Sequence, residues 1–199
     1  QLKNNENSNF SLVSQVQNKF LSWGECLYMG WNSTLFDTKH IQQSFYQNCL
    51  PPYLTNTNGN RQGDALKVTH SSAALFPNSF VRPLSEKTGK ITFQLEKFAS
   101  ANNIGQIKWH DALGDVTATF EVCKMLKERC PDVWDSALIT SSKKGVYNLM
   151  DQDKIFTASR FFRGKSYNAG LVYLTKNPTY ENHIYCFDIK HDPELIFDL

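Results

Sequence analysis

Residues 109–119, Trp109-His110-Asp111-Ala112-Leu113-Gly114-Asp115-Val116-Thr117-Ala118-Thr119, have the sequence of a helix N-terminus that carries a histidine and two aspartates. Asp111 is expected to be the N-cap, its carboxylate accepting hydrogen bonds from the first free backbone N–H groups. From there to about residue 129 the apolar residues recur at helical spacing. The first such stripe is predicted to face the core and comprises Leu113, Val116, Phe120 and Cys123.

The titratable residues of this stretch suggest a catalytic site. Asp115 begins a second stripe beside the apolar one, near the end of the helix where its dipole favours an anion. His110 lies just before the helix and can lean over the same end, and an imidazole beside a fixed carboxylate suits a general base next to a metal ligand. Gly114 indicates that another segment packs closely here. The alternative is a capping aspartate with a surface histidine, and the stretch alone leaves both interpretations open.

The composition is that of an ordinary globular protein. The chain has 199 residues, 41% hydrophobic and 20% charged, with a formal net charge of +2. This charge is too small to indicate a nucleic-acid partner by itself, and no stretch approaches the 18 apolar residues of a membrane span. The five cysteines form no metal-binding or disulfide pattern. They therefore predict reduced thiols and a cytoplasmic location.

The order of the elements predicts an α/β fold. A helix over residues 10–20 precedes a short buried strand over 26–31, and further helices are expected around 41–46 and over 64–75, 93–101, 110–129 and 133–138. Residues 55–63 are expected to form a loop. Asp37 follows the buried strand closely, a common place for a metal or substrate ligand in α/β folds. The alternative is that Asp37 only caps the next helix.

The character of the sequence changes near residue 140. A polar, basic connector over 141–145 is followed by β-rich runs at 155–157, 171–174 and 183–189, separated by turns. We therefore predict two domains, residues 1–139 and 140–199, of which the second is rich in strands.

Together these stretches resemble the bacterial exodeoxyribonuclease I family, within the DEDDh superfamily of 3′–5′ exonucleases. Residues 29–37 resemble the second exonuclease motif, residues 92–96 with 101–104 resemble the segment that leads to the third, and residues 110–115 match the third motif itself. Further matches continue into the second domain at Arg129-Cys130-Pro131, Trp134-Asp135, Arg163-Gly164 and Asn177-Pro178. The resemblance implies a ribonuclease H-like exonuclease fold, without its N-terminal strands, followed by part of a small SH3-like β-domain.

The resemblance also implies a mechanism. Two divalent ions, Mg²⁺ or Mn²⁺, would grip the scissile phosphate, with Asp37 and Asp115 as oxygen ligands. Neutral His110 would take a proton from the attacking water. The product would be a mononucleotide released from the 3′ end of single-stranded DNA during DNA repair or recombination, and single-stranded DNA-binding protein would be a partner.

Several residues are candidates for contacts with DNA. The predicted nucleic-acid contacts are Asn32, Lys143, Lys144, Arg163 and Lys165. Aromatic side chains that could stack on bases are Trp31, Phe161, Phe162 and Tyr167. The alternatives are charges on a solvated connector and aromatic residues in the core of a small barrel.

One departure from the family pattern limits what we expect of this chain. The family's first motif, Asp-x-Glu on a strand, is expected upstream of residue 10, so this section would supply two of four acidic ligands. We therefore expect weak metal binding and little catalysis from residues 1–199 alone. The alternative function is a non-catalytic module of the same fold that binds single-stranded nucleic acid or another protein. A further alternative is an RNA substrate, against which the exonuclease I-like tail argues.

Overall fold

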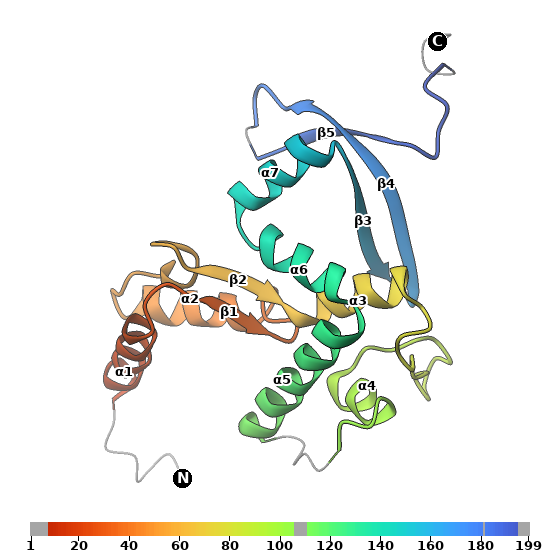
Figure 1. The fold of residues 1–199 in the computed structure, drawn as a ribbon. Coiled ribbons are helices and arrows are strands. Elements are labelled where there is room, and N and C mark those ends of the chain that lie inside the picture. Colours follow the sequence, from red (N-terminus) through yellow and green to blue (C-terminus); the bar gives the residue numbers. More distant parts are fainter. Residues whose placement is uncertain (1–7, 106–110, 181, 195–199) are drawn as a thin grey trace. The chain divides into compact units, whose positions relative to one another are not determined.

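The computed structural model describes residues 8–105, 111–180 and 182–194. The chain, drawn in Figure 1, divides into two compact units, residues 1–66 and 67–199. The boundary between the units lies in the first turn of α3. The domain boundary predicted after residue 139 is a different division of the chain and stays a prediction. Among the described residues, no helix is both long and apolar enough to cross a membrane.

The first unit is built on a short parallel sheet. Its elements are α1 (Asn9–Ser22), β1 (Leu27–Gly30), α2 (Asp37–Gln47), the 3₁₀ helix η2 (Leu54–Asn56) and β2 (Arg61–Asp64). Strands β1 and β2 pair in parallel, from Leu27 opposite Arg61 to Gly30 opposite Asp64. The apolar residues recur at helical spacing in α1 and α2, and this unit's core consists of Val13, Phe45 and Leu54, with Phe20, Ile41 and Leu50 packed against it.

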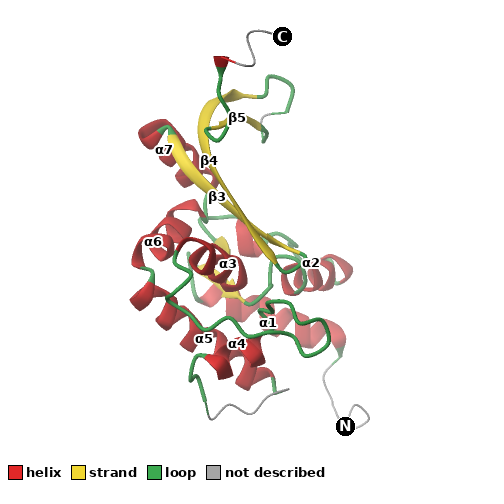
Figure 2. Cartoon of the chain, turned by 90° about the vertical axis from the view of Figure 1, so that its right-hand side faces the viewer, coloured by secondary structure: helices red, strands yellow, loops and turns green. Residues whose placement is uncertain are grey.

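The second unit begins with a series of helices. They are α3 (Ala65–Leu75), α4 (Leu95–Ala101), α5 (Ala112–Arg129), α6 (Pro131–Thr140) and α7 (Lys143–Asp153). Irregular backbone, green in Figure 2, joins α3 to α4. Helix α4 packs on α5, and the core near α4 includes the rings of Phe80, Phe93 and Phe98, whose centroids lie 5.6–6.1 Å apart along the chain of contacts.

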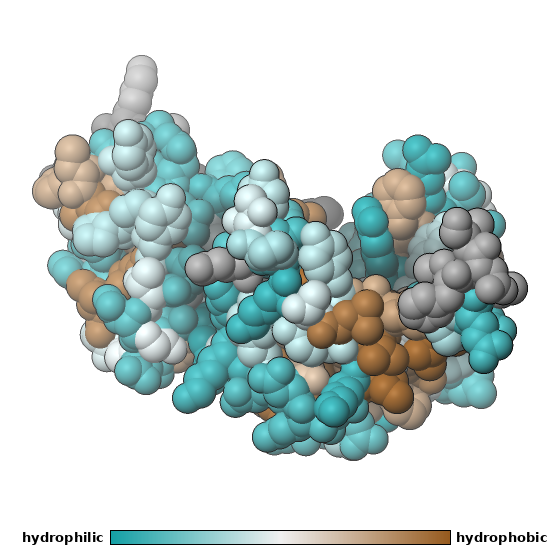
Figure 3. Space-filling model, turned by 90° about the horizontal axis from the view of Figure 1, so that it is seen from above, coloured by the Kyte–Doolittle hydropathy of each residue, from teal (hydrophilic) through white to brown (hydrophobic). Residues whose placement is uncertain are grey.

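The unit ends in an antiparallel sheet of three strands in the order β3 (Ile155–Phe162), β4 (Lys165–Lys176) and β5 (Ile184–Asp188). A two-residue turn at Arg163-Gly164 joins β3 to β4, with both residues at positive φ, as tight hairpin turns require. The register between β4 and β5 shifts between Tyr173 and Thr175, which leaves Leu174 as a bulge. Apolar side chains reach the surface in both units, and brown patches of them are visible on the face shown in Figure 3.

Two elements differ from the sequence prediction. The segment expected to be a loop over 55–63 contains η2 and most of β2, because residues 61–64 pair with the buried strand β1. The residues expected to form a basic connector instead open α7, and the Ser142 hydroxyl caps this helix by accepting from the Gly145 N–H at 3.0 Å. Strand β2 depends on its pairing with β1, and α7 begins at its Ser142 cap. Hydrophobic periodicity predicts neither of these interactions.

The buried face of α5 was also predicted wrongly in part. Leu113, Val116 and Phe120 are 72%, 65% and 61% exposed. The buried residues of this helix are Gly114, Ala118, Val122, Met125 and Leu126. The face that packs is therefore the one that carries the small residues Gly114 and Ala118. Asp111 is at the N-cap position as predicted, but its carboxylate makes no capping hydrogen bond.

The α6–α7 junction yields a stability prediction. A Cβ atom on Gly145 would overlap the carbonyl oxygen of Ile139. We expect Gly145→Ala to lower the free energy of unfolding by about 1–3 kcal/mol, since this overlap outweighs the better helix propensity of alanine. Urea unfolding followed by circular dichroism measures the change. Gly105→Ala, in a loop, is the control, because no described atom lies within 4 Å of the added methyl group. Equal stability of the two variants would contradict the prediction.

Candidate active site

Asp37 lies shortly after the first strand of the parallel pair. It is the first residue of α2 and is exposed, and it is joined to the carboxyl end of β1 by the loop 31–36. The positive end of the α2 dipole favours an anion there. No described residue donates a hydrogen bond to its carboxylate, so its oxygen atoms remain available to a cation. The carboxyl end of parallel strands is where α/β proteins hold their ligands.

The loop that carries Asp37 is held by a residue that sequence reasoning missed as part of the site. Asp64, the last residue of β2, is 5% exposed and accepts hydrogen bonds from Asn32 and Thr34. The helix expected over 64–75 would begin at Asp64, whereas the structure places Asp64 at the end of β2. The signal that could have indicated its role is its position, because Asp64 is the acidic residue directly before α3. Asn32, a predicted nucleic-acid contact, is exposed and held at a left-handed φ of 57°.

Asp115 lies in the first turn of α5. Its side chain is exposed, and its N–H donates to the carbonyl oxygen of Asp111 at 3.0 Å. Neighbouring Gly114 is buried, so the backbone before Asp115 is packed while the carboxylate is open to solvent. As at Asp37, none of the residues that the structure describes donates a hydrogen bond to this carboxylate. Asp115 therefore also presents an acceptor at a positive helix end.

The structure does not bring all of the predicted site residues together. His110, the predicted general base, lies outside the described residues. Asp37 belongs to the first unit and Asp115 to the second, so their approach to a common metal ion stays a prediction. Within residues 8–105, 111–180 and 182–194, no group of three His, Cys, Asp or Glu could hold a metal ion. The two open carboxylates nevertheless have the hard oxygen donors that Mg²⁺ and Mn²⁺ prefer.

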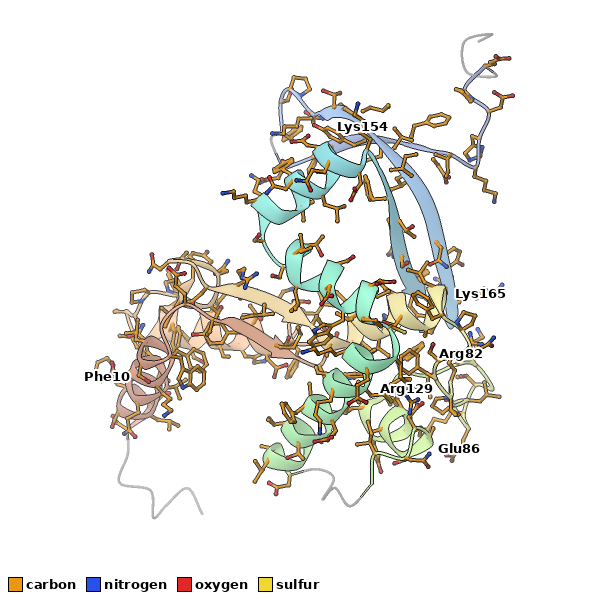
Figure 4. All side chains as sticks on the ribbon, viewed as in Figure 1. Phe10, Arg82, Glu86, Arg129, Lys154 and Lys165 are labelled. Atoms are coloured by element: carbon orange, nitrogen blue, oxygen red, sulfur yellow. The ribbon has the colours of Figure 1, made fainter. Side chains whose placement is uncertain are left out.

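A basic and aromatic cluster surrounds the β3–β4 turn. The guanidinium groups of Arg160 and Arg163 each lie 5.2 Å from the centroid of the Phe162 ring. Phe162 is 46% exposed. Lys165 is exposed at the start of β4, at the opposite end of the hairpin from Lys154 (Figure 4). We call Arg160, Phe162, Arg163 and Lys165 the hairpin cluster; it combines cations for phosphates with an accessible ring.

A second basic cluster lies where α7 meets the end of β4. Lys143 and Lys176 both approach the ring of Tyr147, at 5.9 and 4.1 Å from its centroid. The Lys143 ammonium also donates to the side-chain oxygen of Asn182 at 2.6 Å. Lys144 is exposed in the same turn of α7. Lys176 was not predicted as part of a basic cluster, because its proximity to Lys143 depends on the packing of α7 on the sheet.

The aromatic candidates divide between core and surface. Phe161 packs against His70 and Phe93, with ring centroids 4.6 and 4.8 Å away. The core alternative therefore holds for Phe161. Tyr167 is 53% exposed and Phe162 is similarly accessible, whereas Trp31 is half-buried. Phe162 and Tyr167 remain the better placed candidates for stacking on a base.

Several bacterial proteins named exodeoxyribonuclease I are similar to this chain. No family model matches the chain. The chain is 32% identical to exodeoxyribonuclease I of Haemophilus influenzae over 124 residues, which are 62% of this chain and 26% of the relative. It is 30% identical to exodeoxyribonuclease I of Buchnera aphidicola subsp. Schizaphis graminum over 157 residues, 76% of this chain and 32% of the relative. It is 26% identical to the Escherichia coli protein over 95% of this chain and 40% of that relative.

Solved structures give the same answer for the fold. Exonuclease I of E. coli, in complex with a dA16 oligonucleotide, aligns with a TM-score of 0.74 at 24% identity, over 96% of this chain and 42% of that one. Exonuclease I of Methylocaldum szegediense aligns with a TM-score of 0.77 at 24% identity, over 97% and 42%. The fold is therefore the α/β fold of exonuclease I structures. Over most of its length the chain is an exodeoxyribonuclease I-like sequence, which confirms the predicted resemblance, and it spans 26–40% of the length of these curated relatives.

The thiol on the site-bearing helix α5 gives a prediction about reactivity. Burial raises the pKa of the Cys123 thiol to about 11, so about one thiol in a thousand is ionised at pH 8. Because the thiolate is the nucleophile, we expect iodoacetamide at pH 8 to modify exposed Cys49 at least about tenfold faster than Cys123. Peptide mass spectrometry over time measures both rates, and modification in urea is the control that should equalise them. Equal rates in the native protein would contradict the burial of Cys123.

Proposed function

We propose that this chain takes part in 3′–5′ exonucleolytic cleavage of single-stranded DNA, as part of a metal-dependent phosphodiesterase. The observation that carries the proposal is the similarity to exodeoxyribonuclease I over 62–95% of the chain. The presence of Asp37 and Asp115 as open carboxylates in first helical turns supports it. A solved relative of this fold is bound to a dA16 oligonucleotide.

The chemistry follows from the donor set. Two divalent ions, Mg²⁺ or Mn²⁺, would supply Lewis-acid stabilisation of the attacking and leaving oxygens when bound. Asp37 and Asp115 would hold them through carboxylate oxygens. His110 would accept the proton of the attacking water at an imidazole nitrogen. Asn32 would lie beside the substrate, on the loop that leads to Asp37.

We assign the finer architecture on the same grounds. The parallel pair β1–β2 with its helices fits a ribonuclease H-like exonuclease domain over residues 1–139. The antiparallel strands β3–β5 fit part of an SH3-like β-domain over 140–199. The carboxylates belong to the first of these domains and the two basic clusters to the second, so the second would guide the strand whose 3′ end the first cleaves.

Contacts with the DNA strand are proposed at two places. The hairpin cluster, with Arg163 and Lys165, would bind phosphates and stack Phe162 on a base. Lys143 and Lys144 would bind phosphates near the start of α7. A solved neighbour of this fold is described as an ExoI/SSB-Ct complex, and on that basis we propose single-stranded DNA-binding protein as a partner.

A non-catalytic module is the second candidate. The observation that favours it is the hairpin cluster, in which two arginines flank the accessible Phe162 ring and which needs no metal ion to bind a nucleic-acid strand. Such a module would bind single-stranded DNA through the same basic clusters without releasing nucleotides. Cleavage assays separate the two functions directly.

Substitution of the predicted site residues tests the exonuclease. In the complete gene product we expect His110→Ala to lower the rate of nucleotide release by about 10²–10⁴-fold, because it removes the general base. Asp37→Asn and Asp115→Asn should lower the rate at least as much, since each removes a metal ligand. The measurement is the product ladder from a 5′-labelled oligonucleotide with Mg²⁺.

Asp132→Asn is the matched control for this series. Asp132 is also an exposed carboxylate in the first helical turn, of α6, and its substitution should leave the rate unchanged. Binding of DNA without cleavage by the unsubstituted protein, in Mg²⁺ and in Mn²⁺, would support the non-catalytic module instead.

The salt dependence of binding tests the DNA contacts. Each ionic contact with single-stranded DNA contributes about 0.7 to the slope of log K against log salt concentration. We expect Arg163→Ala and Lys165→Ala each to weaken binding and to reduce the slope by about that amount, as measured by fluorescence anisotropy. Lys19→Ala, an exposed cation on α1, is the control. Slopes unchanged in both hairpin variants would remove this cluster from the DNA path.

A further inference from the structure

The carboxylate of Asp64 is the most heavily hydrogen-bonded side chain near Asp37. One oxygen, Oδ1, accepts from the backbone N–H of Asn32 at 2.9 Å and of Leu66 at 3.2 Å. The other, Oδ2, accepts from the backbone N–H of Thr34 at 3.3 Å and from its hydroxyl at 2.8 Å. Four donors thus converge on two oxygens, which is the full acceptor capacity expected of a carboxylate.

Burial of the Asp64 carboxylate has to be compensated by hydrogen bonds. The side chain is 5% exposed, and the ion pairs found among the described residues, Lys97–Glu86 and Lys124–Glu121, do not include it. A buried carboxylate is unfavourable unless hydrogen bonds replace its hydration. Here three of the four donors, on Asn32 and Thr34, lie 30–32 residues away along the chain, and the fourth is the nearby Leu66 N–H. Asp64 therefore ties the end of β2 to the loop that follows β1.

The loop is also shaped by its own residues and by its junction with α2. Asn32 has a φ of 57°, a left-handed conformation that asparagine adopts more readily than most non-glycine residues. The N-cap of α2, Phe36, makes no side-chain capping hydrogen bond. The first turn of α2 is instead joined to the loop by the Thr38 N–H, which donates to the Ser33 carbonyl oxygen at 2.9 Å.

A second contact fastens the same loop to the same strand. The Ser33 hydroxyl donates to the carbonyl oxygen of Gly63 at 3.2 Å. Gly30 also lies so close to Ser33 that a Cβ atom on residue 30 would stand 2.6 Å from the Ser33 Cβ. The hydrogen bonds therefore form a continuous path from Asp64 through residues 32–34 to the turn of α2 that begins with Asp37.

We propose that Asp64 is a positioning residue that sets the place and direction of Asp37 by clamping the loop 31–36 against the carboxyl end of β2. The catalytic consequence rests on the proposed function, whereas the clamp itself does not. Asp64 touches no reacting atom in this account. It acts only through Asn32 and Thr34.

Hydrogen–deuterium exchange of the complete gene product tests the clamp without any need for activity. In Asp64→Asn an amide group would face the Thr34 N–H, so we expect exchange in the peptide covering 31–38 to accelerate about tenfold or more. Thr34→Val should accelerate exchange in the same peptide, and Thr34→Ser, which keeps the hydroxyl, should restore protection. Unchanged exchange in Asp64→Asn and Thr34→Val would overturn the clamp.

A matched control separates positioning from loss of stability. Thr55 is buried, and its hydroxyl oxygen accepts a hydrogen bond from the side-chain amide of Gln62 at 2.5 Å. Gln62 lies near the start of β2, whereas Asp64 is at its end. Thr55→Val removes a buried hydroxyl of the same unit, away from the loop. It should leave exchange in residues 31–38 at the level of the unsubstituted protein, and acceleration equal to that in Asp64→Asn would overturn the proposal.

Kinetics on single-stranded DNA then test the effect on Asp37. We expect kcat to fall about tenfold to a hundredfold in Asp64→Asn, because a shift of about 1 Å in a ligand can cost that much. KM should change less than kcat, since the proposed DNA contacts of the two basic clusters lie outside the loop and Asn32 is the proposed contact within it. Thr34→Ser should retain most of kcat. Full kcat in Asp64→Asn would overturn the positioning role. Failure of the unsubstituted protein to cleave DNA would refute the proposed function and leave the exchange result standing.

Discussion

The hydrogen bonds between Asp64 and the loop 31–36 are the constraint on which the first unit's candidate site depends. Parallel pairing of β1 with β2 ends at Gly30 opposite Asp64, and from that point the chain must turn into α2 within six residues. The Asp64 carboxylate supplies the acceptors for that turn, since α2 has no side-chain cap of its own. Asp37 itself is exposed at the start of α2.

Helix α5 carries both a buried packing face and the candidate metal ligand Asp115. Its small residues Gly114 and Ala118 are buried and its large residues Leu113, Val116 and Phe120 are exposed. The backbone before Asp115 is therefore buried at Gly114, while the Asp115 side chain is exposed. The same division appears in the β3–β4 hairpin, where Phe161 packs against His70 and Phe93 while Phe162 faces outward between two arginines.

The sequence predicted the elements that carry strong local signals. The helices around Phe10–Phe20, Ile41–Tyr46 and Leu95–Ala101 follow apolar periodicity, and the strand at Leu27–Gly30 is a continuous apolar run. The resemblance to exodeoxyribonuclease I rests on short motifs such as His110–Asp115 and was confirmed by similarity over most of the chain. Strand β2, Arg-Gln-Gly-Asp, could not be predicted in this way, because its residues are extended only by pairing with β1. The buried face of α5 was also beyond periodicity, since both of its stripes contain apolar residues.

The proposed exonuclease function requires Asp37, Asp115 and His110 to serve one metal-dependent site. Anomalous diffraction from crystals of the complete gene product, grown with Mn²⁺ and a single-stranded oligonucleotide, tests it most directly. The account predicts an Mn²⁺ peak about 2.0–2.2 Å from carboxylate oxygens of both Asp37 and Asp115, with the 3′-terminal phosphate beside it and His110 within reach of the attacking water. Mn²⁺ bound away from both aspartates, with the oligonucleotide in place, would contradict it.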